Sequence, residues 1–177
     1  MNSKVVSISS ISAGLIAIAL LVGAYFEFAD LFAVVIASVF VLMPLYLKSY
    51  KGSVLAGLAG GVIAVLCSGL NFLSLVFPTY ITFFCFYPIA KCKMVEKSVK
   101  KIYNYIFGLV WFLIVAYGAY FYYTLVMHGV FEGLPNWISD YILYFIGALS
   151  IVFYFIYDRF IFVVKVFLDK YLSKIIK

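Results

Sequence analysis

GSVLAGLAGGVIAVLCS, residues 52–68, is an uninterrupted apolar stretch in which small residues recur every four positions. Its length falls within the range of about 17 to 25 residues that a helix needs to cross a bilayer. Small side chains at this spacing let neighbouring helices approach closely, which matters in lipid because packing replaces the hydrophobic effect between helices. We therefore predict a membrane helix that is surrounded by other helices. The two small-residue stripes comprise Gly52, Ala56, Gly60, Ala64 and Ser68, and Ser53, Gly57 and Gly61.

The composition of the whole chain is that of an integral membrane protein. Hydrophobic residues make up 67% of the 177 residues and charged residues 11%, whereas soluble domains average about 45–50% apolar and about 25% charged residues. The polar connections between the apolar stretches are short and leave no room for a separate soluble domain. We expect one transmembrane domain over residues 1–177.

Further apolar stretches on both sides of residues 52–68 predict an all-α bundle of about six transmembrane helices. The fourth stretch contains Pro78, which is expected to free the carbonyl of Ser74 and to bend the helix. Charged and apolar residues alternate over residues 160–177, which indicates an amphipathic extension along the inner leaflet. The predicted helices occupy residues 5–25, 31–47, 52–68, 71–90, 102–127 and 139–159.

The positive charges predict the orientation of this bundle. All 13 Lys and Arg residues fall on one side of the membrane in the six-helix arrangement. Short loops rich in Lys and Arg stay in the cytoplasm, so both termini are expected there. We interpret the net charge of +6 as topology and attraction to anionic membrane lipid, and we expect no nucleic-acid partner. The clusters are Lys4, Lys48 to Lys51, Lys91 to Lys101 and Arg159 to Lys177.

The chain contains no catalytic or nucleotide-binding motif, since GxxxxGK[ST], HExxH and GxSxG are all absent. The cysteines form no CxxC pair and there is a single histidine, so we predict no metal site and no cofactor. The nearest approach to an intramembrane charge pair is Asp158 with Arg159, whose side chains point about 100° apart on a helix. We expect both to act as interfacial anchors. The centres of the predicted helices lack Asp and Glu, which argues against a proton-coupled pump that acts alone.

The outer turns contain the polar and aromatic groups from which a ligand site could be built. Turns from different hairpins could converge at the mouth of the bundle, where a few polar groups and an aromatic platform are typical of a small-molecule pocket. The alternative is that these are solvated loop residues. The candidate binding residues are Glu27, Asp30, Asn71, Asn136, Trp137 and Asp140.

The first predicted helix has a stripe of small residues, Ser9, Ala13 and Ala17. Such a stripe either docks a partner helix or packs within the bundle. Together with the six-helix topology and the small-residue third helix, the Ala13-xxx-Ala17 stripe resembles the S components, the substrate-binding subunits of energy-coupling factor vitamin transporters. The resemblance implies a ligand near the outer face, and contact of Ala13 and Ala17 with a transmembrane T component that acts with ATPase subunits.

A closer similarity is to S-component-like membrane proteins of Gram-positive bacteria whose fourth helix ends in an aromatic stretch, Tyr-Pro and a basic loop. This similarity implies the plasma membrane of a bacterium as the location but assigns no substrate. The residues that carry it are Phe83, Phe84, Tyr87, Pro88, Lys91 and Glu96.

These patterns predict a non-enzymatic membrane subunit that captures a small, vitamin-like molecule outside the cell for an ATP-driven partner complex. One alternative is an accessory or structural protein that binds another membrane protein or lipid, and whose outer mouth is closed by Phe and Tyr. Another is a membrane-embedded enzyme that acts on lipid head groups attracted by Lys91 to Lys101.

Overall fold

A computed structural model of the chain describes residues 3–69, 74, 76–126 and 136–175, and within these ranges it consists of helices and turns without strands. The prediction of an all-α fold is therefore confirmed for the described residues. Beside the α-helices there are two 3₁₀ segments, η1 and η2, and a π-helical segment, η3. In chain order the elements are α1 (Ser3–Tyr25), η1 (Glu27–Ala29), α2 (Asp30–Val41), η2 (Met43–Leu47), α3 (Tyr50–Cys67), α4 (Val76–Thr79), η3 (Tyr80–Phe84), α5 (Tyr87–Glu96), α6 (Lys101–Val126) and α7 (Asn136–Ile175).

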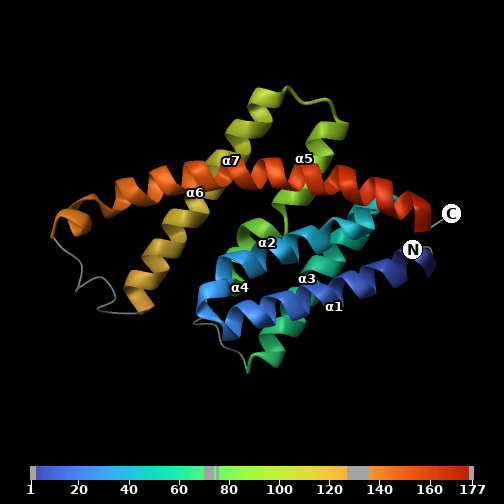
Figure 1. Cartoon of the computed structure of the whole chain (residues 1–177), viewed down its shortest axis with the longest axis horizontal. Helices are drawn as coiled ribbons and strands as arrows, with labels where there is room; N and C mark the ends of the chain where they lie inside the picture. Colours follow the sequence, from blue (N-terminus) through green and yellow to red (C-terminus); the bar gives the residue numbers. More distant parts are fainter. Residues whose placement is uncertain (1–2, 70–73, 75, 127–135, 176–177) are drawn as a thin grey trace.

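Within the described residues, four helical stretches are long and apolar enough to cross a membrane. They match the first, second, third and fifth predicted helices to within a few residues at each end. Both termini lie at the same end of the molecule (Figure 1). The stretches are Ser3–Tyr25, Asp30–Leu47, Tyr50–Cys67 and Lys101–Leu125.

The fourth predicted helix, 71–90, is not one continuous helix in its described part. Helical structure begins at Val76, whose amide donates to the Ser74 hydroxyl oxygen at 3.4 Å. Pro78 therefore lies in the first turn of α4 as described, where its missing N–H is not needed. Most of the predicted helix before Pro78 lies outside the described residues, so the bend there stays a prediction. The interruption comes later: the π-helical η3 ends at Phe84, and α5 starts anew with Pro88 in its first turn.

The sixth predicted helix does not end near Arg159. α7 runs without a break for 40 residues, which corresponds to about 60 Å at about 1.5 Å per residue. That length is roughly twice the thickness of a bilayer's hydrocarbon core. The predicted helix end at residue 159 is therefore wrong, and Asp158 lies near the middle of a helix. An amphipathic extension of residues 160–177 along the inner leaflet stays a prediction.

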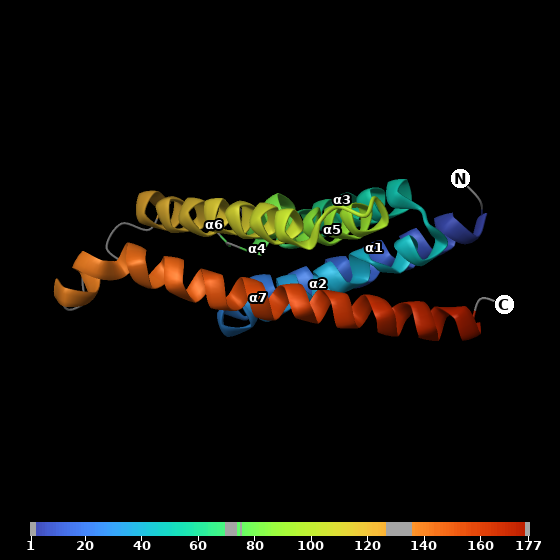
Figure 2. The same cartoon turned by 90° about the horizontal axis from the view of Figure 1, so that it is seen from above.

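The helices form two layers. Figure 2 shows α3, α5 and α6 in one layer and α2 and α7 in the other. α1 packs closely against α3: a Cβ added at Gly60 would lie 2.7 Å from the Cβ of Ile16 and 2.8 Å from the carbonyl oxygen of Ala13. A hydrogen bond from the Ser12 hydroxyl to the carbonyl of Phe40, 2.5 Å long, links α1 to the second layer.

The predicted small-residue stripes of α3 do form its packed face, and Ala56, Gly60 and Ala64 are buried. The expectation that α3 is surrounded by other helices is wrong, however. Leu55 and Leu66 on its other side are 55% and 62% exposed. Such apolar exposure along a helix of spanning length is what contact with lipid requires.

The α1–α3 contact predicts opposite effects of the same substitution at two glycines. Gly60→Ala should lower the stability by about 1–3 kcal/mol, because the new methyl group meets helix α1 in a packed interior. Gly14→Ala is the matched control: nothing lies within 4 Å of a Cβ there, so the better helix propensity of Ala should leave stability equal or raise it by up to about 1 kcal/mol. Thermal unfolding in one detergent measures both, and equal effects would contradict the close α1–α3 packing.

Candidate functional site

A cavity of about 420 Å³ lies between the two layers, where α2 and α7 face α4, η3 and α6. Most of its lining is apolar, and the polar side chains among the described lining residues are Asp30, Thr79 and Ser150. Its size falls within the range of about 300–1,000 Å³ that is usual for small-molecule sites. The apolar lining comes from Leu31, Val34, Val76, Phe84, Phe112, Val115, Ala116, Ala119, Leu149 and Phe153.

The polar side chains that line the cavity come from α2, α4 and α7. Asp30 is the first residue of α2, and a carboxylate there interacts favourably with the positive end of the helix dipole. The Thr79 hydroxyl donates to the carbonyl of Val76 at 3.2 Å. Ser150 lies on the buried face of α7 and is 8% exposed.

Aromatic rings separate this cavity from a polar cluster deeper in the bundle. The ring of Phe112 stacks on Phe153 at 5.6 Å and meets Phe84 edge-on at 6.4 Å. The ring centroid of Phe112 also lies 6.3 Å from that of Tyr154, which belongs to the polar cluster. The cavity and the cluster are thus neighbours that share an aromatic wall.

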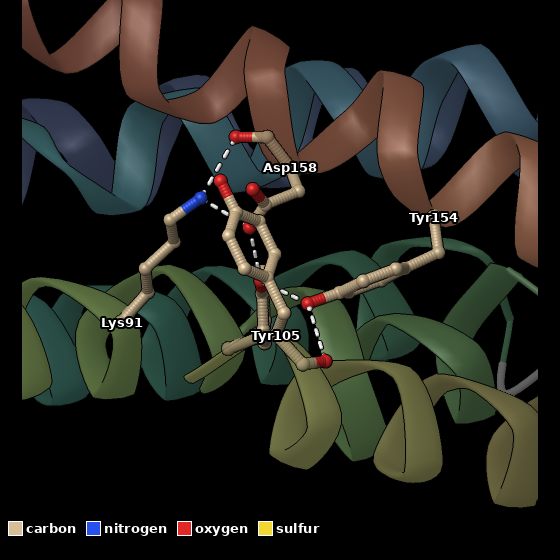
Figure 3. Close-up of polar contacts among 5 residues, drawn as sticks. Lys91, Tyr105, Tyr154 and Asp158 are labelled. Atoms are coloured by element: carbon tan, nitrogen blue, oxygen red, sulfur yellow. Dashed lines mark hydrogen bonds and ion pairs between the residues drawn. The ribbon is translucent and has the colours of Figure 1, made fainter. Parts of the chain in front are cut away.

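The polar cluster centres on an ion pair between Lys91 of α5 and Asp158 of α7, both buried. The Lys91 ammonium also donates to the backbone carbonyl of Asp158 at 2.9 Å, and the Tyr87 hydroxyl donates to the Asp158 carboxylate. The hydroxyls of Tyr87 and Tyr154 lie 3.0 Å apart, and Tyr154 donates to the carbonyl of Tyr105 on α6 at 3.2 Å. Figure 3 shows how these groups from three helices converge.

Helical spacing brings the cluster together. Tyr87 and Lys91 are four residues apart on α5, as are Tyr154 and Asp158 on α7, and residues at this spacing share one face of a helix. The same face of α7 continues to Ser150 in the cavity. A single stripe of α7 therefore runs from the ion pair to the cavity.

The expectation for Asp158 is corrected by this arrangement. Asp158 is 2% exposed and pairs across the bundle, so it is not an interfacial anchor; Arg159 is exposed. Asp158 is thus a carboxylate buried inside the bundle, at the end of the predicted sixth helix. The signal that was missed is the pair of four-residue spacings, Tyr-xxx-Lys and Tyr-xxx-Asp. The basic residues that follow Lys91 favour a solvated loop at this position, and they obscure its pairing with Asp158.

Among the predicted binding residues, Asp30 is one whose side chain the structure describes, and it lines the cavity. Glu27 begins η1, three residues before Asp30. The backbone of Asn136, Trp137 and Asp140 forms the first turns of α7, which in both Figures 1 and 2 project beyond the α1–α2 turn along the long axis of the molecule. Asn71 lies outside the described residues, and a common mouth formed by all six residues remains a prediction.

Sequence reasoning did not find the other lining residues. Thr79, Ser150, Phe112 and Phe153 lie inside apolar stretches, where nothing in the pattern distinguishes a residue that faces a cavity from one that faces lipid. For Phe84, the sequence supports only the resemblance to S-component-like proteins described above.

The predicted docking residues Ala13 and Ala17 are buried, with exposed fractions of 7% and 4%. Their face of α1 packs against α3, as the approach of Gly60 to Ala13 demonstrates. A partner helix cannot contact side chains that are already covered. In this structure the stripe serves packing within the bundle, and the docking role does not fit it.

Comparison of the chain with protein-family models, with curated proteins and with solved structures finds no match. Any assignment of function therefore rests on the geometry and the chemistry of these residues.

The buried ion pair predicts a non-additive mutant cycle. Lys91→Met and Asp158→Leu should each destabilise the protein by about 3–5 kcal/mol, because each leaves an uncompensated buried charge. The double variant should recover most of that loss, since it buries no charge at all.

Arg159→Met is the control for this cycle, because it removes a neighbouring charge that is exposed. It should leave the unfolding midpoint unchanged. Unfolding of all four variants in one detergent provides the measurement, and additive losses in the double variant would contradict a direct pairing of Lys91 with Asp158.

Proposed function

We propose that the chain is the substrate-capturing membrane subunit of an ATP-driven uptake transporter of the energy-coupling factor type. The observation that carries this proposal is the cavity of about 420 Å³, walled by aromatic rings and open to a few polar groups. Sites of this size and lining are typical of small-molecule recognition. The chain has no nucleotide-binding loop, so partner subunits supply the energy.

The proposed topology has six crossings with both termini in the cytoplasm. Beside the four apolar helices, the composite segment α4–η3–α5 and the first half of α7 provide the remaining two crossings. The cavity includes Asp30 at the start of α2, whereas Lys48 and Lys51 follow the opposite end of that helical stretch. Together with the positive-inside rule, this arrangement supports a cavity in the outer half, where an extracellular solute would enter.

The rival function is an accessory membrane protein without a solute site. Its distinguishing feature is an outer half closed by Phe and Tyr side chains. The cavity has Phe84, Phe112 and Phe153 on its walls, yet small residues of α6, Ala116 and Ala119, leave its centre empty. This combination favours solute binding. The partner complex would contact a lipid-facing surface other than the Ala13–Ala17 stripe.

Filling the cavity should abolish solute binding without unfolding the protein. Ala119→Phe places a ring in the space that a ligand needs, while Leu125→Phe on the same helix adds a ring at a position 72% exposed. We expect a ligand from a vitamin and cofactor panel to raise the unfolding midpoint of the parent protein and of Leu125→Phe, but not that of Ala119→Phe. If the ligand raised the unfolding midpoint equally in all three proteins, the cavity would not be the binding site.

The topology is tested by labelling single cysteines in a variant that lacks the three native ones. Lys97→Cys lies in the exposed turn after α5, and Phe28→Cys lies in η1, where Phe28 is 91% exposed. An impermeant thiol reagent added to intact cells should label Phe28→Cys only. Labelling of Lys97→Cys from outside, with Phe28→Cys protected, would reverse the proposed orientation.

A further inference from the structure

We propose that the hairpin of α5 and α6 binds an anionic phospholipid of the cytoplasmic leaflet. An acyl chain lies in an apolar groove along α6, and the phosphate lies at Lys97 and Lys100. The groove shares no described lining residue with the cavity above, and its occupation requires no solute. The proposed topology serves here only to name the leaflet.

The groove has the length of one acyl chain. Its volume is about 620 Å³, and its described lining runs from Met94 of α5 and Val99 of the turn to Ile114 of α6. Ile106 and Ile114 are 55% and 65% exposed, so the bundle leaves this surface open. The distance from Tyr103 to Ile114 along the helix is about 16 Å at about 1.5 Å per residue. That is roughly half of the hydrocarbon core of about 30 Å, which corresponds to one leaflet.

The shape of the lining suits a lipid chain better than a partner helix. The described lining residues are Met, Val, Tyr, Ile, Phe and Trp, and none of them is Gly, Ala or Ser. Membrane helices dock through small residues that let their backbones approach closely, as α1 and α3 do at Gly60. Bulky side chains along the groove prevent such an approach, whereas a flexible acyl chain adapts to an irregular apolar surface.

The turn between α5 and α6 closes the groove at one end. The amide of Ser98 donates to the carbonyl of Val95 at 3.1 Å, and Ser98 has a left-handed φ of 54°. The amide of Val99 donates to the carbonyl of Met94, also at 3.1 Å. These two bonds form a Schellman motif, which an apolar contact commonly accompanies, and both Met94 and Val99 line the groove. In Figure 1 the hairpin of α5 and α6 projects beyond α7.

Positive charge is concentrated at this closed end. Lys97 follows Met94 by three residues, and Lys100 precedes Tyr103 by three, a spacing that places side chains on one face of a helix. Both Lys side chains are exposed. From Lys93 to Lys101 the chain carries four Lys against one Glu, and the first turn of α6 has no acidic residue. Basic groups beside an apolar groove match a phosphate attached to an acyl chain.

Trp111 lines the groove and can report on the lipid that occupies it. A Trp137→Phe variant retains Trp111 as its single tryptophan, since the chain has two. This full-length protein is placed in phosphatidylcholine vesicles that contain increasing fractions of phosphatidylglycerol or phosphatidylcholine with brominated acyl chains. We expect the brominated phosphatidylglycerol to quench Trp111 fluorescence at an at least about tenfold lower fraction, because two Lys side chains favour the anionic lipid by this order of affinity.

Paired Lys variants link the preference to the closed end of the groove. Lys97→Gln combined with Lys100→Gln should remove the difference between the two brominated lipids. Lys4→Gln combined with Lys51→Gln is the matched control, because it removes two exposed Lys of other basic clusters and should retain the difference. The unfolding midpoint of each variant shows whether the fold persists.

Three results would overturn the lipid site. Equal quenching by the two lipids, or a preference that survives without Lys97 and Lys100, would exclude recognition of the anionic head group there. Loss of the preference in the Lys4 and Lys51 control would indicate general surface charge instead of a site. Absence of quenching by either lipid would mean that protein, such as a second copy of the chain, covers the groove. None of these outcomes bears on the cavity, which the Ala119→Phe variant tests.

Discussion

The burial of one carboxylate is the constraint on which the arrangement of α5, α6 and α7 depends. Asp158 lies near the middle of the 40-residue α7 and is removed from solvent, so its charge must be compensated inside the bundle. Lys91 provides the opposite charge from α5, and the hydroxyls of Tyr87 and Tyr154 extend the network to the backbone of α6. These contacts determine which face of α7 points inward.

The inward face of α7 also determines where the cavity lies. With Asp158 held in place, Tyr154 and Ser150 follow on the same stripe toward the start of the helix, and Phe153 turns its ring against Phe112. The small side chain of Ala119 on α6 cannot fill the space opposite. A cavity next to the aromatic rings results, because Ala116 and Ala119 on the facing side are too small to fill the space.

The positions of the basic clusters, the ion pair and the cavity fit the proposed solute-capture function. In the proposed topology, the basic clusters and the ion pair lie toward the cytoplasmic end of the bundle, whereas the cavity lies toward the other end. The same face of α7 carries Ser150, which lines the cavity, and Asp158, which forms the ion pair.

The sequence by itself determined the all-helical class and the positions of the apolar stretches, because length, composition and the spacing of small residues act locally along the chain. It also identified Asp30 as a candidate binding residue from its place at a polar boundary. Tertiary structure alone decided that Asp158 pairs with Lys91, that Ala13 is buried, and that Ser150 faces a cavity. These outcomes depend on which faces of distant helices meet, and a periodic apolar pattern cannot distinguish a face that meets protein from one that meets lipid.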